Sequence, residues 1–163
     1  MAGLYDSIQI VSALVNSGQT IDFSVGSRAN GPFRVTDFDW APKIVGDAPG
    51  KTQGAGSWPT WRDVRLLEIQ MEGRIVGSSP SDYWEHREAL SKAVVPPPNF
   101  DRYYRRHGTM NVGLPHVGTV WAYINLVDFS MPVSHAEGSS SKFAFTWHAD
   151  LGYWTSGSTP IAL

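Results

Sequence analysis

Five histidines are the first residues of this 163-residue chain that could do chemistry, as metal ligands or as proton carriers. Four of them, His107, His116, His135 and His148, are scattered through the second half of the chain, and no two have the spacing of a zinc motif. There is no cysteine to complete a metal site or to form a disulfide. We interpret these histidines as surface or interface residues, and we expect neither a metal ion nor another cofactor.

A nucleophilic site has one candidate, the short run of Ser134, His135 and Glu137. These are the residue types of a nucleophile, a general base and the carboxylate that orients the base. They are almost adjacent in a stretch rich in glycine and serine, and no strained nucleophile turn accompanies them. The run is typical of a solvated loop and predicts no catalysis.

Two pairs of carboxylates are the candidates for general acid–base chemistry. Asp37 and Asp39 are two residues apart, and Glu68 and Glu72 are four apart, so each pair shares one face of its predicted strand. Glycosidases place two acids around the bond that they cleave. Acids at this spacing more commonly form the solvated side of a sheet, which is the interpretation we prefer. We therefore expect that the chain is not an enzyme.

Basic and aromatic residues alternate in the segment 102–107, Arg-Tyr-Tyr-Arg-Arg-His. They could stack on nucleic acid or on a sugar, or contact a neighbouring subunit, where Arg and Tyr are favoured. The net charge of −2 favours the subunit contact, because nucleic-acid binding needs an excess of cations. The residues predicted to lie at a subunit interface are Trp58, Trp61, Arg62, Arg102, Tyr104, Arg105, Arg106, Tyr153 and Trp154.

The composition and the length predict one globular domain. Seven Trp, seven Phe and six Tyr can fill a core, whereas charged residues make up only 17% of the chain, below the usual ~25%. Either partners cover some apolar surface, or the core takes all of the aromatic residues. No run of about 18 apolar residues is present, and the N-terminus lacks the features of a signal peptide, so we expect no membrane segment.

Alternation of apolar and polar residues predicts a mainly β protein. In the clearest stretch, Phe143, Phe145 and Trp147 share one face of a strand. The pattern predicts strands over residues 8–14, 20–25, 33–40, 61–76, 107–113, 117–129 and 142–148. The alternation over 33–40 is irregular, which indicates a bulge. Such strands with one helix favour a β-sandwich, or a barrel-like sheet, with the helix packed on it.

Two segments depart from the β pattern. Residues 41–60 are rich in Gly and Pro without periodicity and predict a long irregular loop. Helical spacing follows Ser79, which forms a capping box with Pro80 and Asp82, and it must end before the prolines at 96–98. The helix is therefore expected around residues 80–94. We expect one β domain over residues 1–155 and a short C-terminal tail over 156–163.

Three motifs in this order resemble the N-terminal domain of siphophage distal tail proteins. They are the strand-to-helix passage 64–90, the strand 108–112 with its long partner, and the Phe-Ala-Phe-Thr-Trp strand 143–147 ahead of Asp-Leu-Gly-Tyr-Trp at 150–154. The similarity covers residues 3–154. Leu151 and Gly152 stand where the family often has a lone proline, and the chain ends without the galectin-like domain of longer members. Direct binding of a receptor or a sugar by this chain is therefore not implied by the resemblance.

The resemblance implies a β-sandwich with a flanking helix and a structural role in the virion tail, after assembly in the host cytoplasm. It implies a homohexameric ring that joins the tail tube to tip or hub proteins and leaves a channel for DNA, with no membrane and no catalysis. DNA must pass without sticking, so we expect polar, neutral or acidic residues in the lumen, with Glu68 and Glu72 as candidates. The alternative is a carbohydrate-binding β-sandwich in which Trp58 and Trp61 stack on sugar rings.

Overall fold

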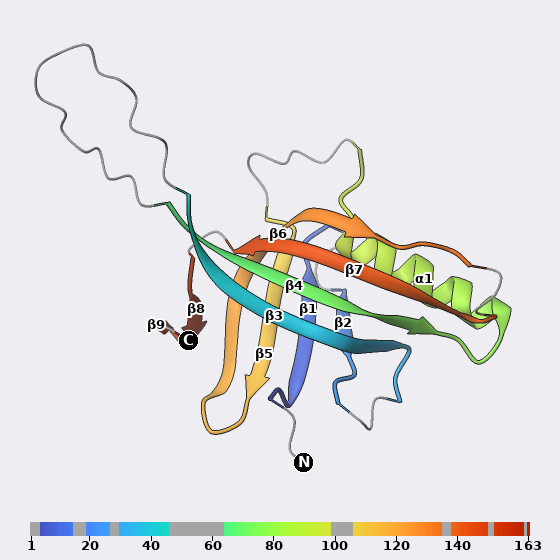
Figure 1. Cartoon of the computed structure of the whole chain (residues 1–163), viewed down its shortest axis with the longest axis horizontal. Helices are drawn as coiled ribbons and strands as arrows, with labels where there is room; N and C mark the ends of the chain where they lie inside the picture. The colour runs from blue at the N-terminus through green and yellow to red at the C-terminus, as the bar shows by residue number, and fades with distance from the viewer. Residues whose placement is uncertain are drawn as a thin grey trace, which may run out of the picture.

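The computed structural model of the chain describes residues 4–14, 19–26, 30–45, 64–98, 106–134, 138–149, 152–161 and 163 (Figure 1). In these ranges the strands and the helix are β1 Ser7–Ser12, β2 Thr20–Phe23, β3 Phe33–Val45, β4 Val64–Val76, α1 Pro80–Val94, β5 Gly108–Leu114, β6 Gly118–Ser130, β7 Ser140–Ala149, β8 Trp154–Ser156 and β9 Thr159–Ile161. The helix of this part of the chain lacks the length and apolar character of a membrane span. Over the described ranges the protein is mainly β with one helix, as expected.

The strands form one antiparallel sheet in the order β2-β1-β5-β6-β7-β4-β3, and β8 joins β6 to β9. Strand β6 belongs to both halves of the sheet. Its first part, up to Ile124, pairs with β5, and its second part pairs with β7. At the far end of the order, Ser24 bridges Arg34, so the region after β2 meets β3. The sheet thus folds back on itself like a sandwich, and the bridge brings its two ends together as in a barrel.

The core lies between the two halves of the folded sheet. Alternate residues of β7 fill its centre, since Phe143, Phe145 and Trp147 are only 1–2% exposed. Their rings follow one another at centroid distances of 5.3 and 5.2 Å. This strand confirms the alternation that the sequence predicts. Aliphatic residues of β1, β4, β5 and β6 complete the core, among them Ile10, Ile69, Met110 and Ile124.

Helix α1 begins and ends as its sequence predicts. The Ser79 hydroxyl accepts a hydrogen bond from the Asp82 backbone N–H, and Pro80 takes the first helical turn. The Asp82 carboxylate reaches one residue further back than a standard capping box, accepting from the Ser78 N–H and hydroxyl at 2.7 and 2.9 Å. Buried Tyr83 then ties the helix to β7 through a 2.7 Å hydrogen bond between its hydroxyl and that of Ser141.

Two expectations about segment boundaries are wrong. Residues 41–45 belong to β3 rather than to the predicted loop, and only the remainder of that loop lies outside the described residues. Pro42 is compatible with a strand here because β3 lies at the sheet edge, where a missing N–H costs no ladder bond. The predicted C-terminal tail also contains a strand, because β9 pairs with β8 around a tight turn that Gly157 makes at φ +59°.

The predicted irregularity in β3 is confirmed. The register between β3 and β4 shifts between Val35 and Asp37, so one extra residue of β3 is accommodated there. A second shift lies in β6, between Leu126 and Asp128. Each bulge changes which side chains reach the solvent on that strand.

Candidate subunit interface

The half-sheet β6-β7-β4-β3 has two edges that no described strand covers over much of their length. Strand β3 pairs with β4 on one side, and on the other the Ser24 bridge accounts only for its first residues. Among the described strands, β6 pairs only with β7 beyond Ile124, although the N–H groups of Leu126 and Phe129 donate to His107 Nδ1 and Asp128 Oδ1. An open edge presents backbone N–H and C=O groups that can pair with another chain. These two edges are referred to below as the β3 edge and the β6 edge.

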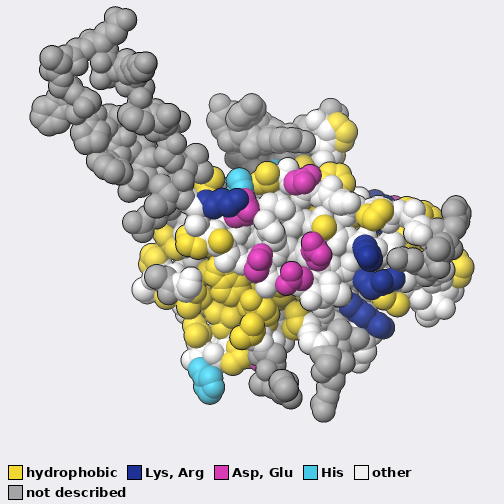
Figure 2. All heavy atoms as spheres, in the orientation of Figure 1, with side chains coloured by type: hydrophobic (Ala, Val, Ile, Leu, Met, Phe, Trp, Pro, Cys, Tyr) yellow, Lys and Arg dark blue, Asp and Glu magenta, His cyan; other side chains and the backbone are white. Residues whose placement is uncertain are grey.

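Aromatic side chains line the β3 edge. The Tyr5 hydroxyl donates to the Phe38 carbonyl oxygen at 3.1 Å, and the Tyr5 ring packs on Phe38 and Trp40 at centroid distances of 5.1 and 5.6 Å. Burial, followed by the charges of Asp39 and Asp37, raises the pKa of Tyr5, so it keeps its proton as a donor. Leu4 beside it is 80% exposed. Figure 2 shows a continuous apolar area next to β3.

Apolar side chains also mark the β6 edge. Val127, Phe129 and Val133 are 54%, 49% and 53% exposed, although large apolar residues are usually buried. Phe129 lies opposite Phe145, on the core side of the sheet, but beyond the part of the core that covers Phe145. These three residues are not among those predicted from the sequence to lie at an interface. Their signal was present, because the apolar content of residues 117–129 exceeds strict alternation.

The solvent face of this half-sheet is acidic in its middle. Along β4 the outward positions alternate with the buried residues Leu67, Ile69 and Met71. Register places Asp37 opposite Glu72, and Asp39 opposite Gln70. Both carboxylate pairs, Asp37 with Asp39 and Glu68 with Glu72, thus lie on the solvent side of the sheet, as the sequence predicts. Figure 2 shows acidic side chains at the centre of this face.

Cations occupy the end of the same face. Arg34 lies opposite Arg74, and Arg74 lies opposite Lys142, so the three form one row across β3, β4 and β7. Figure 2 shows Lys and Arg side chains to the right of the acidic centre. Arg74 donates from its Nε to the Ser140 hydroxyl at 3.2 Å, and Arg34 to the Gly31 carbonyl oxygen at the same distance. The charge of this face therefore changes along its strands, from acidic in the middle to basic at this end.

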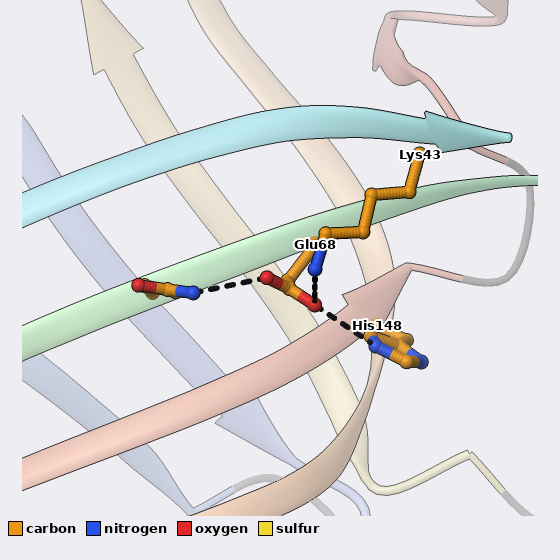
Figure 3. A network of polar contacts seen from close by, with 4 residues as sticks. Lys43, Glu68 and His148 are labelled. Carbon is orange, nitrogen blue, oxygen red and sulfur yellow. Dashed lines mark hydrogen bonds and ion pairs between the residues drawn. The ribbon is translucent and has the colours of Figure 1, made fainter.

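Glu68 is the centre of a polar network at the opposite end of this face (Figure 3). Its carboxylate lies 2.6 Å from the Lys43 ammonium and 3.5 Å from His148 Nε2, and it accepts from the Gln70 amide at 2.9 Å. The hydrogen bond from Lys43, with smaller contributions from Gln70 and His148, lowers the pKa of Glu68 below its ordinary value. The network joins β3, β4 and β7 and leaves Glu68 ionised at neutral pH.

Only three of the predicted interface residues lie in the described part of the chain. Trp154 is 1% exposed and packs on Trp40 at 5.3 Å, so it belongs to the core and cannot contact a neighbouring subunit in this structure. Tyr153 is half-buried beside it. Arg106 is exposed and its guanidinium stacks on Tyr123 at 3.5 Å. Arg106 lies beside the beginning of the β6 edge, because the next residue, His107, is bonded to the β6 backbone at Ile124 and Leu126.

The other predicted interface residues fall outside the described residues. They are Trp58, Trp61, Arg62, Arg102, Tyr104 and Arg105. That these six residues lie at a subunit interface stays a prediction.

The described residues hold no group of three His, Asp or Glu side chains that could bind a metal ion. His107 is buried, and its Nδ1 accepts from the Leu126 backbone N–H at 2.8 Å, a structural role. His116 lies in the exposed turn before β6 with φ +66°. Of the candidate nucleophilic run, Ser134 is described and exposed, whereas His135 and Glu137 lie outside the described residues.

Comparisons with known proteins give limited similarity. No family model matches the sequence, and no curated protein matches it. Among solved structures, the chain is similar to one from the tail of an empty gene transfer agent particle with C6 symmetry, with 14% identity, a TM-score of 0.42, and 96% of this chain and 95% of that chain covered. A chain from the virion of a native gene transfer agent particle gives 14% identity, a TM-score of 0.36, and coverage of 77% and 82%. At these scores and identities the two matches establish neither the fold nor the function.

Proposed function

We propose that this chain is a structural protein of a phage-like tail. It forms a closed homo-oligomeric ring at the distal end of the tail, joins the tail tube to tip or hub proteins, and leaves a channel for DNA. One observation carries the proposal: a four-stranded half-sheet with an open edge on each side, both edges flanked by exposed or half-buried apolar side chains. The family resemblance of the sequence adds the location in the tail and the expected count of six subunits.

Strand direction supports pairing of the β3 edge of one copy with the β6 edge of the next. The four strands alternate in direction, because each neighbouring pair is antiparallel. Rotation about a ring axis keeps every strand's direction along that axis. The two edge strands, β3 and β6, run in opposite directions, so they would meet as another antiparallel pair. Such head-to-tail contacts are heterologous and close into a ring when the rotation between copies fits.

In this proposed ring the acidic face would line the channel. The core side of the half-sheet is covered by β1, β2, β5 and α1, which are too bulky to lie inside a narrow ring. The solvent face, with Asp37, Glu72 and Glu68, would then look inward. The acidic centre of this face repels phosphates, which favours passage of DNA without binding there, whereas the row of Arg34, Arg74 and Lys142 at one end attracts them. Both candidate lumen residues of the sequence analysis, Glu68 and Glu72, lie on this face.

Phe129→Lys tests the proposed edge contact. A charge at the β6 edge should block pairing with the next copy, since edge lysines are a common protection against strand addition. Native mass spectrometry and electron microscopy of the unmodified protein should show closed rings, and the variant should be at least tenfold depleted in them. Val117→Lys is the matched control, because Val117 is 47% exposed but lies in the turn before β6. Loss of rings in both variants, or in neither, would contradict the proposed contact between the β6 edge of one copy and the β3 edge of the next.

A further inference from the structure

We propose that the outer face of the second half-sheet binds a neutral oligosaccharide, with Trp121 as its stacking residue. This face is formed by β2, β1, β5 and the first part of β6, on the side away from the core. It is distinct from the acidic face of β3, β4 and β7. The proposal does not rest on ring formation, because every residue of the site comes from one copy.

Four side chains form one row across this face. Register places Asp22 opposite Gln9, Gln9 opposite Asn111, and Asn111 opposite Trp121. The burial pattern of β1, β5 and β6 shows that these positions alternate with buried core residues, so the row faces outward. Three strand spacings separate its ends, a length of about 14 Å. A row of this length can contact more than one sugar ring.

Hydrogen bonds hold the polar part of the row in place. The Gln9 amide donates to Asp22 Oδ1 at 2.7 Å, and the Asn111 amide donates to the Gln9 carbonyl oxygen at 3.3 Å. Each amide group has a second N–H, and Asn111 has its carbonyl oxygen, for which the described residues provide no side-chain partner. The row therefore offers oriented donors and acceptors at a small cost in side-chain entropy.

Trp121 is also fixed in orientation. Its indole N–H donates to the Gly157 carbonyl oxygen at 3.1 Å, in the turn between β8 and β9. Tyr123 meets it edge to face at a centroid distance of 5.0 Å, and the Arg106 guanidinium stacks on Tyr123. Trp121 is half-buried, which leaves part of the ring to a ligand. The Trp121 indole forms the aromatic end of the row, and the Tyr123 ring with its stacked Arg106 guanidinium lies beside it.

These groups match the chemistry of a sugar. One side of a pyranose ring carries C–H groups that pack on an aromatic ring, while its hydroxyls donate and accept hydrogen bonds in the way that amides and carboxylates require. A neutral sugar is favoured because the Asp22 carboxylate would repel an acidic one. Single-stranded nucleic acid also stacks on aromatic rings, but it needs several cations along its path. Among the described residues, Arg106, which stacks on Tyr123 beside the row, is the cation that the contacts place there.

The test uses cellotetraose and chitotetraose as probes, titrated at millimolar concentration into the full chain. Side-chain amide and indole N–H signals in NMR spectra report binding at Gln9, Asn111 and Trp121. At least one probe should shift these signals in a saturable way. Asn111→Ala, and separately Trp121→Phe, should weaken binding about tenfold, which corresponds to roughly 1.4 kcal/mol. Trp84→Ala is the matched control, because Trp84 is 53% exposed on α1, outside this face.

Four results would overturn the proposal. One is that neither probe shifts the signals. A second is that Trp84→Ala weakens binding as much as the site variants do. A third is that Asn111→Ala and Trp121→Phe, each shown to be folded, both bind as well as the unmodified protein. The fourth is binding of an oligo(dT) probe at these same signals, with a steep loss of affinity as salt rises, in place of either sugar. Unchanged amide spectra away from the site confirm that each variant is folded.

Discussion

At the residue scale, the network around Glu68 stabilises the fold in a pH-dependent way. Its pKa is lowered first by the hydrogen bond from Lys43, so the folded chain binds this proton less tightly than the unfolded chain does. Ionised Glu68 therefore gives its full contribution to the free energy of unfolding at pH values above the pKa of the unfolded chain, about 4.3. This contribution is lost as the pH falls through the lower pKa that Glu68 has in the folded chain. The Glu68 carboxylate links β3, β4 and β7. We therefore expect its pH-dependent stabilisation to act on the half-sheet that carries both open edges.

Glu68→Gln tests that linkage. The variant should unfold at a lower urea concentration than the unmodified protein at pH 7, and the difference should narrow as the pH is lowered from 5 to 3. Lys43→Met removes the main partner of Glu68. Its difference from the unmodified protein in the urea concentration of unfolding should also narrow between pH 5 and pH 3. A difference of constant size across this range would contradict the assignment.

A second residue-scale prediction concerns the buried contact between Tyr83 and Ser141. Tyr83→Phe removes one hydroxyl and leaves the Ser141 hydroxyl, which is 1% exposed, without this 2.7 Å partner. We expect a loss of about 1–3 kcal/mol in the free energy of unfolding. Urea unfolding of both single variants and the double variant measures the coupling. If Ser141→Ala restores none of the stability lost in Tyr83→Phe, the hydrogen bond is not the cause.

At the scale of single elements, α1 was the most predictable part of the chain. Ser79, Pro80 and Asp82 set its start by chemistry that acts over three residues, and Pro96 limits its end. The strand ends were predictable only to within a few residues, because an edge or a bulge depends on distant partners. Pro42 illustrates this point: it reads as a loop residue until β4 is known to pair with one side of β3 only.

The cap of α1 gives a prediction at this scale. Ser79→Ala removes the acceptor for the Asp82 N–H and should cost about 1 kcal/mol of unfolding free energy, measured by urea unfolding. Ser81→Ala is the matched control, because Ser81 lies exposed inside the first turn, where alanine is a better helix former. Equal destabilisation by the two substitutions would mean that the cap contributes nothing specific.

At the scale of the whole molecule, the sequence predicted the fold class better than the surfaces. Alternation in β7 identifies Phe143, Phe145 and Trp147 as core because a strand has only two faces. It cannot show that β6 pairs with β5 along one part and with β7 along another, which is what leaves the β6 edge open. For the same reason Trp154 was expected at an interface, whereas the fold-back of the sheet buries it against Trp40.

The two half-sheets give the molecule two different outer faces. One is acidic in its centre and lies between the two open edges, and the other carries the row from Asp22 to Trp121. In a ring, the first would face the channel and the second the surroundings. The acidic face and the sugar-binding row can be tested separately, because they share no residue.

Disulfide cross-linking between copies tests the ring most directly, since the chain has no cysteine of its own. Asp39→Cys with Asp128→Cys, and Asp37→Cys with Ser130→Cys, place one thiol on each edge in a common antiparallel register, and all four positions lie on the solvent face of the half-sheet. Oxidation should give a ladder of covalent oligomers that ends at the ring size, because paired strands bring Cα atoms within the ~4.4–6.8 Å that a disulfide requires. Asp39→Cys with Asn111→Cys, on the other outer face, should stay monomeric. A strictly monomeric product from both edge pairs, at concentrations where the protein is associated, would contradict pairing of the β3 and β6 edges.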